Sequence, residues 1–553
     1  MTDVISALVD RAARPDDIFC RFVSHGQTRT LTARQVLAGA ARYAHLFRAA
    51  GLGPDDVVVI VLKHAPDLYF GFLGAMLARC APSFMPFPSA KQDPHHYWAQ
   101  HREVFARIGV AAVVTYEENA AVLAEECPGL KVFTPADAAG LPEDFPVPKV
   151  GGEDIAFLQH SSGTTGLKKG VMLSYGAVER QLDCYAEALA LGPGDTIVSW
   201  LPLYHDMGMI ACFMLPLTKG APLVSLDAFE WVAQPDLLFQ AIEDFGGTHA
   251  WLPNFAFHHL IRAVREDFAA DLSGMKAFVD CSEPCRMETF ALFEQTFARL
   301  GVRAEQLRVC YAMAETVFAV TQTPAGELAR AVEVDEDGLA DGRAQPPVRP
   351  ERARQVISVG APIRDVELKV VDDAGAALPD DVVGEVAARA PFLFSGYHKD
   401  PERTAAKLRG GWYHTGDLGF LRDRELYLLG RTDDLVILNG RNVFAHHVEF
   451  AINAGAPQVK AGRCVALGVF SEAVGSQELV IIAEVQSDET AVRRQVARAV
   501  REIVLDGFGV LPKEVKMVEP GWLAKTTSGK IARDLNLRKY LDAKGGRTVS
   551  AAT

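Results

Sequence analysis

Helical and strand-like hydrophobic patterns alternate along the first part of the chain. Within residues 31–62, apolar residues recur at helical spacing from Val36 to Phe47, and the run VVVIVL that follows has the length and branched composition of a buried strand. The same order of helix and buried strand recurs over residues 68–84 and 103–115. This alternation predicts an α/β fold in which mostly parallel sheets are covered by helices.

A second pattern begins near Gly430. Before it, residues 410–430 (GGWYHTGDLGFLRDRELYLLG) contain two strand-like runs separated by turn residues, which predicts a small β region. After it, VALGVF and ELVIIAEV have the pattern of strands, and a helix with valine at every fourth position starts near Asp488. We therefore expect a large N-terminal domain over residues 1–430 and a small α+β domain over residues 431–553.

Residues 325–356 differ from both patterns. They are acidic at first, then rich in Arg, Gln and Pro, and they contain few large apolar residues. We expect this segment to be a surface insertion rather than part of a core.

Composition and charge narrow the classes of function. The chain has 553 residues, of which 49% are hydrophobic and 23% charged, as in an ordinary globular enzyme. The formal net charge of -14 argues against a nucleic-acid partner, which needs clustered Lys and Arg. The apolar run Leu68–Leu77 is too short to span a bilayer, no signal peptide is visible, and the nine scattered cysteines fit buried free thiols. These features predict a cytoplasmic protein.

The segment FLQHSSGTTGLKKGVML (residues 157–173) carries the clearest chemical signature. Four hydroxyl residues and three glycines follow a buried run within ten positions, with Lys169 among them. Glycines let the backbone approach a phosphate, while hydroxyls and backbone N–H groups donate hydrogen bonds to it. The loop differs from the GxxxxGK[ST] loop of P-loop NTPases. A plain Gly/Ser turn is the alternative that the composition of this loop leaves open.

The loop SSGTTGLKKG resembles the signature loop of the adenylate-forming superfamily, which includes acyl-CoA synthetases, peptide-synthetase adenylation domains and luciferases. Further segments resemble the other motifs of this superfamily in the expected order. They are LPLYHDMGM (201–209), YAMAE (311–315), YHTGDLG (413–419), GRTDDLVILNGRNV (430–443) and KTTSGKIAR (525–533).

Within this superfamily the likeness is greatest to fatty acyl-AMP ligases. LPNFAF (252–257), SEPCRMETF (282–290) and YAMAETVFAVTQ (311–322) resemble that branch, as does the extra segment at 325–356. The resemblance implies that the chain activates a carboxylic acid with ATP and Mg²⁺, forms the acyl-adenylate and releases pyrophosphate. It also implies transfer of the acyl group to the phosphopantetheine thiol of a separate acyl carrier protein.

The resemblance assigns the nucleotide to particular residues. Glu315 would help to hold Mg²⁺, which prefers hard oxygen ligands, and it is counted among the catalytic residues. The remaining nucleotide-binding residues would be Ser161, Ser162, Gly163, Thr164, Thr165, Gly166 and Lys169 around the phosphates, and Tyr311, Ala312, Met313, Ala314 and Thr316 around the adenine and the phosphates.

Four more assignments concern the ribose and the moving domain. Asp417 would accept hydrogen bonds from both ribose hydroxyls, and Arg431 would add a ribose contact. Lys530 would reach the α-phosphate and the substrate carboxylate as the catalytic lysine, and Asp433 would be the hinge of a mobile C-terminal domain. Without the resemblance to these motifs, Asp417 would be interpreted as a turn residue and Lys530 as a solvated surface lysine.

His205 is expected to flank the acyl pocket, where positioning of the carboxylate is favoured over proton transfer. In the amino-acid-activating members of the superfamily an Asp at this position pairs with the substrate ammonium group. The His at position 205 therefore argues against an α-amino acid substrate. The other pocket candidates are mostly apolar, which suits an aliphatic or aryl acid; they are Trp200, Met207, Met209, Met214, Trp251, Asn254, Phe257 and Ser282.

Two residues depart from the superfamily pattern, and two other functions stay open. Lys168 replaces a proline of the phosphate loop, and Ala312 replaces the glycine of the YGxxE motif. One alternative function is an acyl-CoA ligase, which differs only in using free CoA as the thiol. The other is a nucleotide- or acyl-binding module without catalysis, against which Lys530, Glu315 and Asp417 argue.

Overall fold

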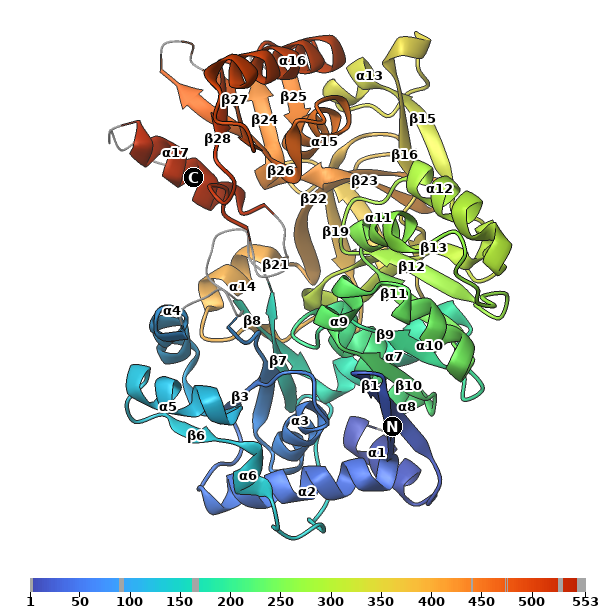
Figure 1. Ribbon diagram of the computed structural model, residues 1–553, viewed down its shortest axis with the longest axis vertical. Coiled ribbons are helices and arrows are strands. Elements are labelled where there is room, and N and C mark those ends of the chain that lie inside the picture. Colours follow the sequence, from blue (N-terminus) through green and yellow to red (C-terminus); the bar gives the residue numbers. More distant parts are fainter. Residues whose placement is uncertain are drawn as a thin grey trace.

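The largest sheet of the protein has nine strands, of which the central ones run parallel (Figure 1). The structure, a computed structural model, describes residues 3–88, 94–161, 169–438, 441–472, 474, 476–525 and 531–544. In spatial order the nine strands are β17 (Ala361–Pro362), β14 (Ala319–Gln322), β13 (Leu307–Ala312), β12 (Ala277–Cys281), β11 (His249–Leu252), β9 (Ile197–Ser199), β10 (Leu223–Leu226), β1 (Ile18–Ser24) and β2 (Gln27–Thr32).

Helices cover both faces of this sheet, because successive residues of a buried strand point to opposite sides. On β12, Val279 belongs to one apolar core and Phe278 to the other. The Val279 face packs against α1 (Val4–Ala12), α7 (Tyr175–Leu189), the π-helix η1 (Met207–Met214) and α8 (Leu215–Lys219), and the Phe278 face packs against α9 (Ala228–Ala233), α10 (Leu237–Phe245), α11 (Asn254–Ala263) and α12 (Met287–Phe297).

A second sheet, with four parallel strands, contains the elements predicted for the first 115 residues. Val36 and Phe47, which marked the helical pattern, are fully buried on α2. The elements are α2 (Ala33–Ala49), β3 (Val57–Val61), α3 (Asp67–Leu77), β4 (Ala81–Phe84), α4 (Pro94–Ile108), β5 (Val110–Thr115), α5 (Glu117–Glu126), β6 (Lys131–Phe133) and α6 (Pro135–Ala138). The predicted α/β class, with parallel sheets under helices, is confirmed.

Antiparallel strands form the β region between the nine-stranded sheet and the C-terminal residues. The two strands predicted within residues 410–430 are β22 and β23, which pair with each other. A five-stranded sheet contains β18 (Glu367–Val371), β19 (Gly384–Arg389), β21 (Leu408–Arg409), β22 (Trp412–Arg422) and β23 (Glu425–Arg431), and a three-stranded sheet contains β7 (Ile155–Ser161), β8 (Lys169–Ser174) and β20 (Gly396–Tyr397); α14 (Pro401–Lys407) follows β20.

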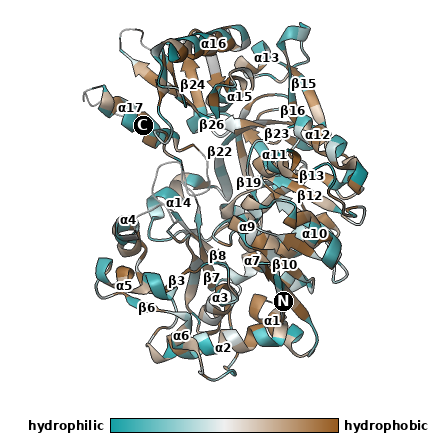
Figure 2. Ribbon diagram, in the orientation of Figure 1, coloured by the Kyte–Doolittle hydropathy of each residue, from teal (hydrophilic) through white to brown (hydrophobic). Residues whose placement is uncertain are grey.

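The C-terminal residues have apolar cores of their own. Val496, Val500 and Val504 line the buried side of α16 as predicted, and Figure 2 shows the mixed hydropathy of this helix. The elements are β24 (Leu435–Leu438), β25 (Arg441–Phe444), α15 (Ala445–Gly455), β26 (Val459–Ser471), β27 (Ser476–Val485), α16 (Thr490–Phe508), β28 (Glu514–Val518) and α17 (Arg533–Ala543). The expected α+β composition is therefore present.

The prediction that residues 325–356 contribute no core is wrong. They form the hairpin-like pair β15 (Ala331–Asp335) and β16 (Ala353–Ile357), with α13 (Glu336–Ala340) between them. Val334 and Val356 are buried in a small apolar cluster with Phe420 of β22 and Phe444 of β25. The alternation of short strands puts these few valines on one face, so a small number of apolar residues suffices to anchor the insertion.

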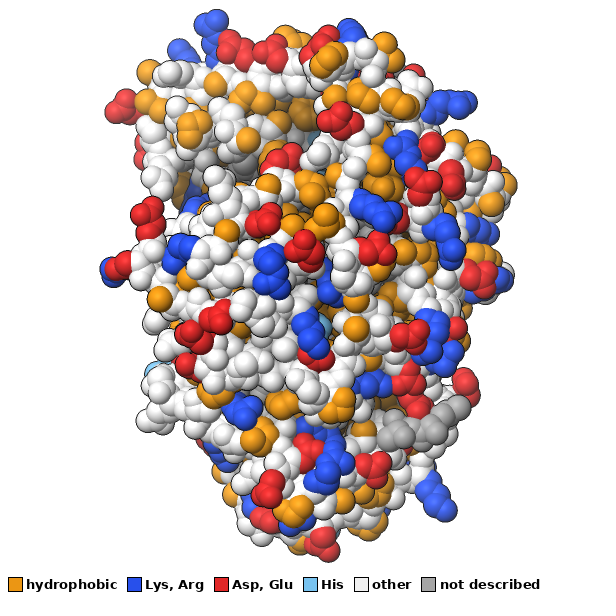
Figure 3. All heavy atoms as spheres, turned by 90° about the vertical axis from the view of Figure 1, so that its right-hand side faces the viewer, with side chains coloured by type: hydrophobic (Ala, Val, Ile, Leu, Met, Phe, Trp, Pro, Cys, Tyr) orange, Lys and Arg blue, Asp and Glu red, His pale blue; other side chains and the backbone are white. Residues whose placement is uncertain are grey.

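Charges of both signs are mixed on the face shown in Figure 3, where Lys and Arg lie among Asp and Glu. The nine cysteines are free thiols, and all except the partly exposed Cys285 are buried. Within the part of the chain that the structure describes, no helix is both long enough and apolar enough to cross a membrane.

Candidate active site

The carboxyl ends of the parallel strands of the nine-stranded sheet bring several motif residues to one edge. Because β9, β11, β12 and β13 run in the same direction, the residues that follow them meet there. These residues are Trp200, which directly precedes the LPLYHDMGM segment, and Asn254, Ser282 and Met313 from three further motifs. Ligands of open α/β sheets bind at such edges, so the sheet itself indicates where the site lies.

Asp417 lies between Tyr311 and Arg431. The Tyr311 hydroxyl donates a hydrogen bond to Oδ2 of Asp417, and Nε of Arg431 lies 3.3 Å from Oδ1. The backbone N–H of Asp417 donates to the Thr415 hydroxyl at 2.9 Å, and the Thr415 hydroxyl donates to a backbone carbonyl of β19. Burial raises the pKa of the Asp417 carboxyl, while Arg431 and the Tyr311 hydroxyl oppose that rise. The structure thus brings three predicted nucleotide residues together.

Glu315 lies in a second polar group that joins three short elements. It sits in the 3-10 helix η4 (Ala314–Thr316), and the Tyr397 hydroxyl donates to its Oε1 at 2.7 Å. The hydroxyl of Tyr413 lies 3.4 Å from that of Tyr397. The Lys169 ammonium lies 5.4 Å from the centroid of the Tyr397 ring. Burial lowers the pKa of Lys169, and the carboxylate of Glu315 opposes this change.

The predicted phosphate loop begins and ends beside Glu315. Ser161 is the last residue of β7 and Lys169 the first of β8, and these two residues are paired in the antiparallel ladder. Both strands contact η4. Ser162, Gly163, Thr164, Thr165, Gly166 and Lys168 lie outside the described residues, as does the side chain of Ser161. The structure therefore places the two strand ends that flank the predicted phosphate loop.

A strained turn fixes the backbone around Glu315. Val317 has φ 64° and ψ -53°, and the N–H of Phe318 donates to the carbonyl of Thr316 at 2.7 Å, which together make a γ-turn that β-branched residues rarely adopt. The Thr316 hydroxyl, which is buried, donates toward the carbonyl of Phe318 at 2.9 Å. In this arrangement the Thr316 hydroxyl stabilises the turn, and its contact with phosphate stays a prediction.

A single carboxylate suits Mg²⁺ at Glu315. Among the described residues there is no group of three or more His, Cys, Asp and Glu side chains that could hold a metal ion. Mg²⁺ is commonly held by one or two carboxylates together with substrate phosphates and water, and Glu315 is a hard oxygen ligand beside the phosphate loop. The donor set therefore fits Mg²⁺ that arrives with a nucleotide.

His205 precedes the π-helix η1. The N–H of Met209 donates to the carbonyl of His205 at 2.8 Å, and the ring of Tyr204 lies 4.8 Å from the imidazole. A Cβ at Gly208 would overlap the carbonyl of Pro202, so only glycine permits this close approach. π-Helical segments are frequent at functional sites, and this one begins two residues after His205.

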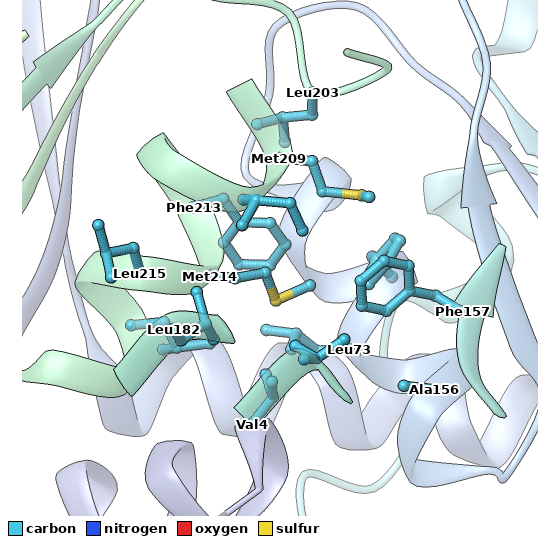
Figure 4. Close-up of a cluster of buried hydrophobic side chains, with 14 of the residues drawn as sticks. Val4, Leu73, Ala156, Phe157, Leu182, Leu203, Met209, Phe213, Met214 and Leu215 are labelled. Carbon is cyan, nitrogen blue, oxygen red and sulfur yellow. The ribbon is translucent and has the colours of Figure 1, made fainter. Parts of the chain in front are cut away.

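The predicted acyl-pocket residues separate into an edge group and a core group. Trp200 stacks on Trp231 with ring centroids 3.8 Å apart, and Met207 and Met209 lie on η1. Figure 4 shows Met209 beside Leu203, whereas Met214 lies deeper, near Leu73 and Leu182. Asn254 and Ser282 belong to the edge group.

Trp251 and Phe257 lie in core positions. The indole N–H of Trp251 donates to the Tyr185 hydroxyl at 2.7 Å. Phe257 packs against Phe290 and Phe293 on the opposite side of the sheet, with ring centroids 5.7 and 5.0 Å away. Met214, Trp251 and Phe257 therefore contribute to the apolar cores, and contact of the edge group with an acyl chain stays a prediction.

The segment that carries Lys530 is fixed at both ends. Residues 526–530, including Lys530, lie outside the described residues, but Lys525 and Ile531 form a β-bridge. The side chain of Asn536, fully buried, accepts from the N–H of Ala524 at 2.8 Å and donates to the carbonyls of Ala524 and Ala532 at 2.9 Å. Asn536 therefore anchors the chain on both sides of Lys530.

The predicted hinge is an exposed residue between two strands. Asp433 lies in the 3-10 helix η6 (Thr432–Asp434) that joins β23 to β24. The next residue, Asp434, is ion-paired with Arg533 of α17, which also lies 2.7 Å from Glu449 of α15. The residues after Asp433 are therefore tied to the C-terminal core, and Asp433 itself stays a prediction as the pivot.

Sequence reasoning missed Tyr397, Tyr413 and Asn536. Tyr413 stands inside the YHTGDLG segment, so its proximity to Asp417 was a usable signal. Tyr397 and Asn536 carry no comparable signal, because only the pairing of β20 with β8 and the packing of α17 place them.

Several known proteins resemble this chain in sequence or in fold. Residues 9–398 match the family model described as AMP-binding enzyme. The medium-chain-fatty-acid–[acyl-carrier-protein] ligase JamA of Moorena producens is 29% identical over 73% of this chain and 70% of its own length. The long-chain-fatty-acid–AMP ligase FadD26 of Mycobacterium bovis is 28% identical over 97% of both chains. A structure from the work on fatty acyl-adenylate ligases of E. coli and L. pneumophila superposes with a TM-score of 0.90, 25% identity and 98% coverage of both chains.

Proposed function

This chain belongs to the AMP-binding enzyme family, and we propose that it is an acid–AMP ligase acting on a fatty or aryl carboxylic acid. The substrate carboxylate oxygen attacks the α-phosphorus of ATP, the bond to the β-phosphate oxygen breaks, and the products are acyl-adenylate and pyrophosphate. The nucleophile belongs to the substrate, so the protein needs to supply alignment and charge stabilisation rather than a covalent nucleophile.

The observation that carries this proposal is the convergence of two polar groups at one edge of the sheet. Tyr311 and Arg431 hold the Asp417 carboxylate, which is suited to accept from both ribose hydroxyls. Tyr397 holds Glu315 beside the strand that begins with Lys169. A nucleotide bound across the two groups has its ribose at Asp417 and its phosphates at Glu315.

The remaining site residues take roles in the same scheme. Ser161, Ser162, Thr164, Thr165 and Lys169 surround the β- and γ-phosphates, and Gly163 and Gly166 allow the close approach of the backbone. Glu315 would hold Mg²⁺, which supplies positive charge to the phosphates when it is bound. Lys530 reaches the α-phosphate from the C-terminal side, and His205 positions the carboxylate.

The proposal includes a division of the chain into two domains after residue 430. Residues 1–430 bind ATP and the acid, and residues 431–553 form the domain that brings Lys530 in and later withdraws it. Asp433 is the residue at which this domain turns. The separate apolar cores after Val436 and the exposed position of Asp433 support that division.

The second half-reaction transfers the acyl group to the phosphopantetheine thiol of an acyl carrier protein. The thiolate attacks the acyl carbon, and AMP leaves. The insertion supports a carrier rather than free CoA, because Val334 and Val356 form one apolar cluster with Phe444 of the C-terminal residues. A carrier protein can offset the loss of these contacts with interface contacts of its own, whereas CoA offers fewer.

The test has two stages. Hydroxylamine trapping of the adenylate across a panel of fatty and aryl acids, with acid-dependent pyrophosphate release, measures the first half-reaction. Acylation of a holo-carrier and of CoA, each at saturation, measures the second. No acid-dependent pyrophosphate release from any acid would refute the ligase, and faster acylation of CoA than of the carrier would replace the carrier with CoA.

A further inference from the structure

Four basic side chains meet where the insertion, α12 and α15 come together, on the upper part of the molecule in Figure 1. We call this group the basic seam; it consists of Arg286, Arg354, His446 and His447. Arg286 precedes α12, Arg354 lies on β16 of the insertion, and the histidines are in the first turn of α15. No role in the proposed adenylation uses these residues.

Contacts across the basic seam join all three elements. Arg354 donates a hydrogen bond to Nε2 of His447, and the His446 and His447 rings are 3.9 Å apart. The guanidinium carbon of Arg286 lies 3.3 Å from the centroid of the Phe450 ring on α15. Because Arg is never an acceptor, Nε2 of His447 must be unprotonated to accept this bond.

The two guanidinium groups lack close counter-charges. Among the described residues, no carboxylate oxygen lies within 4.0 Å of a side-chain nitrogen of Arg286 or Arg354. Arg352, two positions from Arg354, is instead paired with Glu336 at 3.1 Å and with Asp337 at 2.6 Å. Glu336 and Glu288 act on Arg354 and Arg286 only from a greater distance. The basic seam therefore has excess positive charge.

Burial, together with this excess charge, keeps the histidines neutral. Burial, followed by Arg354, Arg533 and Arg286, lowers the pKa of His446 to about 3. Burial, His446 and the same two seam arginines lower the pKa of His447 well below its usual value. Burial likewise lowers the pKa of Arg354 to about 10. An anion placed among these groups would reverse the electrostatic part of each shift.

The basic seam and the ribose site lie on opposite sides of one strand. A Cβ at Gly430 would lie 2.6 Å from Cε1 of His446, so that side of β23 faces the seam. The next residue, Arg431, points the other way and contacts Asp417. The seam is therefore a place distinct from the nucleotide site.

We propose that the basic seam is a second anion-binding site, which takes a phosphate dianion or a phosphate ester group between Arg286, Arg354 and the first turn of α15. Guanidinium groups pair with phosphate oxygens through parallel hydrogen bonds, and the N-terminus of an α-helix favours negative charge. Such a ligand bridges the insertion and α15.

Sulfate is the first probe, because its charge does not change near neutral pH. The measurement is calorimetric titration at pH 7, with AMP present to fill the nucleotide site. We expect binding in the wild type and a loss of affinity of roughly tenfold or more in Arg354→Gln, equivalent to one lost charge-assisted contact.

Arg349→Gln is the matched control, because Arg349 lies in the same insertion, is exposed and contacts Asp337 at 3.1 Å. It should bind sulfate as the wild type does. Thermal unfolding checks that each variant is folded, and Arg286→Gln replaces Arg354→Gln if the latter is not. Equal sulfate affinity in the wild type and both seam variants overturns the proposal.

Inorganic phosphate and pantetheine 4′-phosphate then distinguish the two sources of the anion. Both should bind in a manner that depends on Arg354. Tighter binding of the ester assigns the site to the arm of a thiol substrate, and equal binding assigns it to free phosphate. Failure of both to bind contradicts the anion site, while leaving acid-dependent pyrophosphate release, and thus the proposed ligase, untouched.

Discussion

The phenolic hydroxyl of Tyr311 donates a hydrogen bond to the carboxylate of Asp417, although the two residues are 106 positions apart in the chain. Tyr311 lies near the end of β13 in the nine-stranded sheet, and Asp417 lies on β22 of the antiparallel β region. This bond therefore joins two sheets at the point where we propose that the ribose binds, and it opposes the effect of burial on the pKa of Asp417.

Tyr311→Phe should raise the KM for ATP roughly tenfold, because a hydrogen bond to a charged group contributes about 1.5–3 kcal/mol. The lost bond lowers the pKa of Asp417 in the wild type, so its removal raises that pKa. The acid limb of kcat/KM for ATP should move to higher pH, since Asp417 must be ionised to accept from the ribose. Tyr540→Phe removes a similar hydroxyl–carboxylate bond, to Glu514, and should change neither quantity.

Lys530→Ala should lower kcat for adenylation by roughly 10²–10³ with nearly unchanged ATP binding, as expected for loss of a group that acts on transition-state charge. Asn536→Ala should lower the same kcat by a smaller factor, because Asn536 anchors both sides of that segment. The double variant should be no slower than Lys530→Ala alone. Asn453→Ala, at a partly buried position in the last turn of α15, is the control. Additive losses would show that Asn536 acts independently of Lys530.

Asp433→Pro should leave adenylate formation intact and reduce thioester formation at least roughly tenfold, since proline fixes φ near −65° and opposes the rotation of the C-terminal residues. The φ of proline suits the short 3-10 helix in which Asp433 lies. Pyrophosphate release reports the first half-reaction, and acylation of a holo-carrier reports the second. Asp433→Ala should retain both. Equal loss of both half-reactions in the proline variant would exclude Asp433 as the pivot.

Asp280→Asn should stabilise the protein at neutral pH. Asp280 is fully buried on β12, neither carboxyl oxygen has a hydrogen-bond partner among the described residues, and burial raises its pKa well above the usual value. The folded state therefore holds a proton that the unfolded state releases above about pH 3.9. Stability contributed by the neutral acid is complete below that pH and is lost as the pH rises toward the folded pKa.

The measurement is the Tm of wild type and Asp280→Asn between pH 5 and pH 8. The variant should have the higher Tm at pH 8, and the difference should shrink at lower pH. Asp373→Asn, at an exposed position, should follow the wild type. Parallel Tm curves for wild type and Asp280→Asn would show that the carboxyl of Asp280 keeps the same pKa in both states.

The insertion shows where composition misleads. Residues 325–356 contain few apolar side chains, and composition therefore predicted a segment without a core. The structure buries Val334 and Val356 against Phe420 and Phe444, which belong to elements far along the chain. A few apolar residues can form part of a core when the residues that pack against them come from distant parts of the chain. A short stretch of sequence does not contain those partners.

The acyl pocket shows the same limit. Apolar type alone could not separate Met209, near Leu203, from Met214, which is packed in the interior five residues further along the same π-helix. The helix decides which side chain faces the edge and which faces the core. Trp251 and Phe257 are buried for a related reason, since the strand and helix that carry them turn those rings toward the two cores.

The sequence by itself determined the alternation of helices and strands, the α+β composition of the C-terminal residues and the identity of the motif residues, because periodicity and motif chemistry are local properties of a chain. Only the tertiary structure decided that Tyr311 and Arg431 hold Asp417, that Tyr397 holds Glu315, and that Arg354 meets His447. These contacts join different sheets and helices. Their geometry depends on how the sheets twist and pack, and the spacing of side chains along one helix or strand does not determine it.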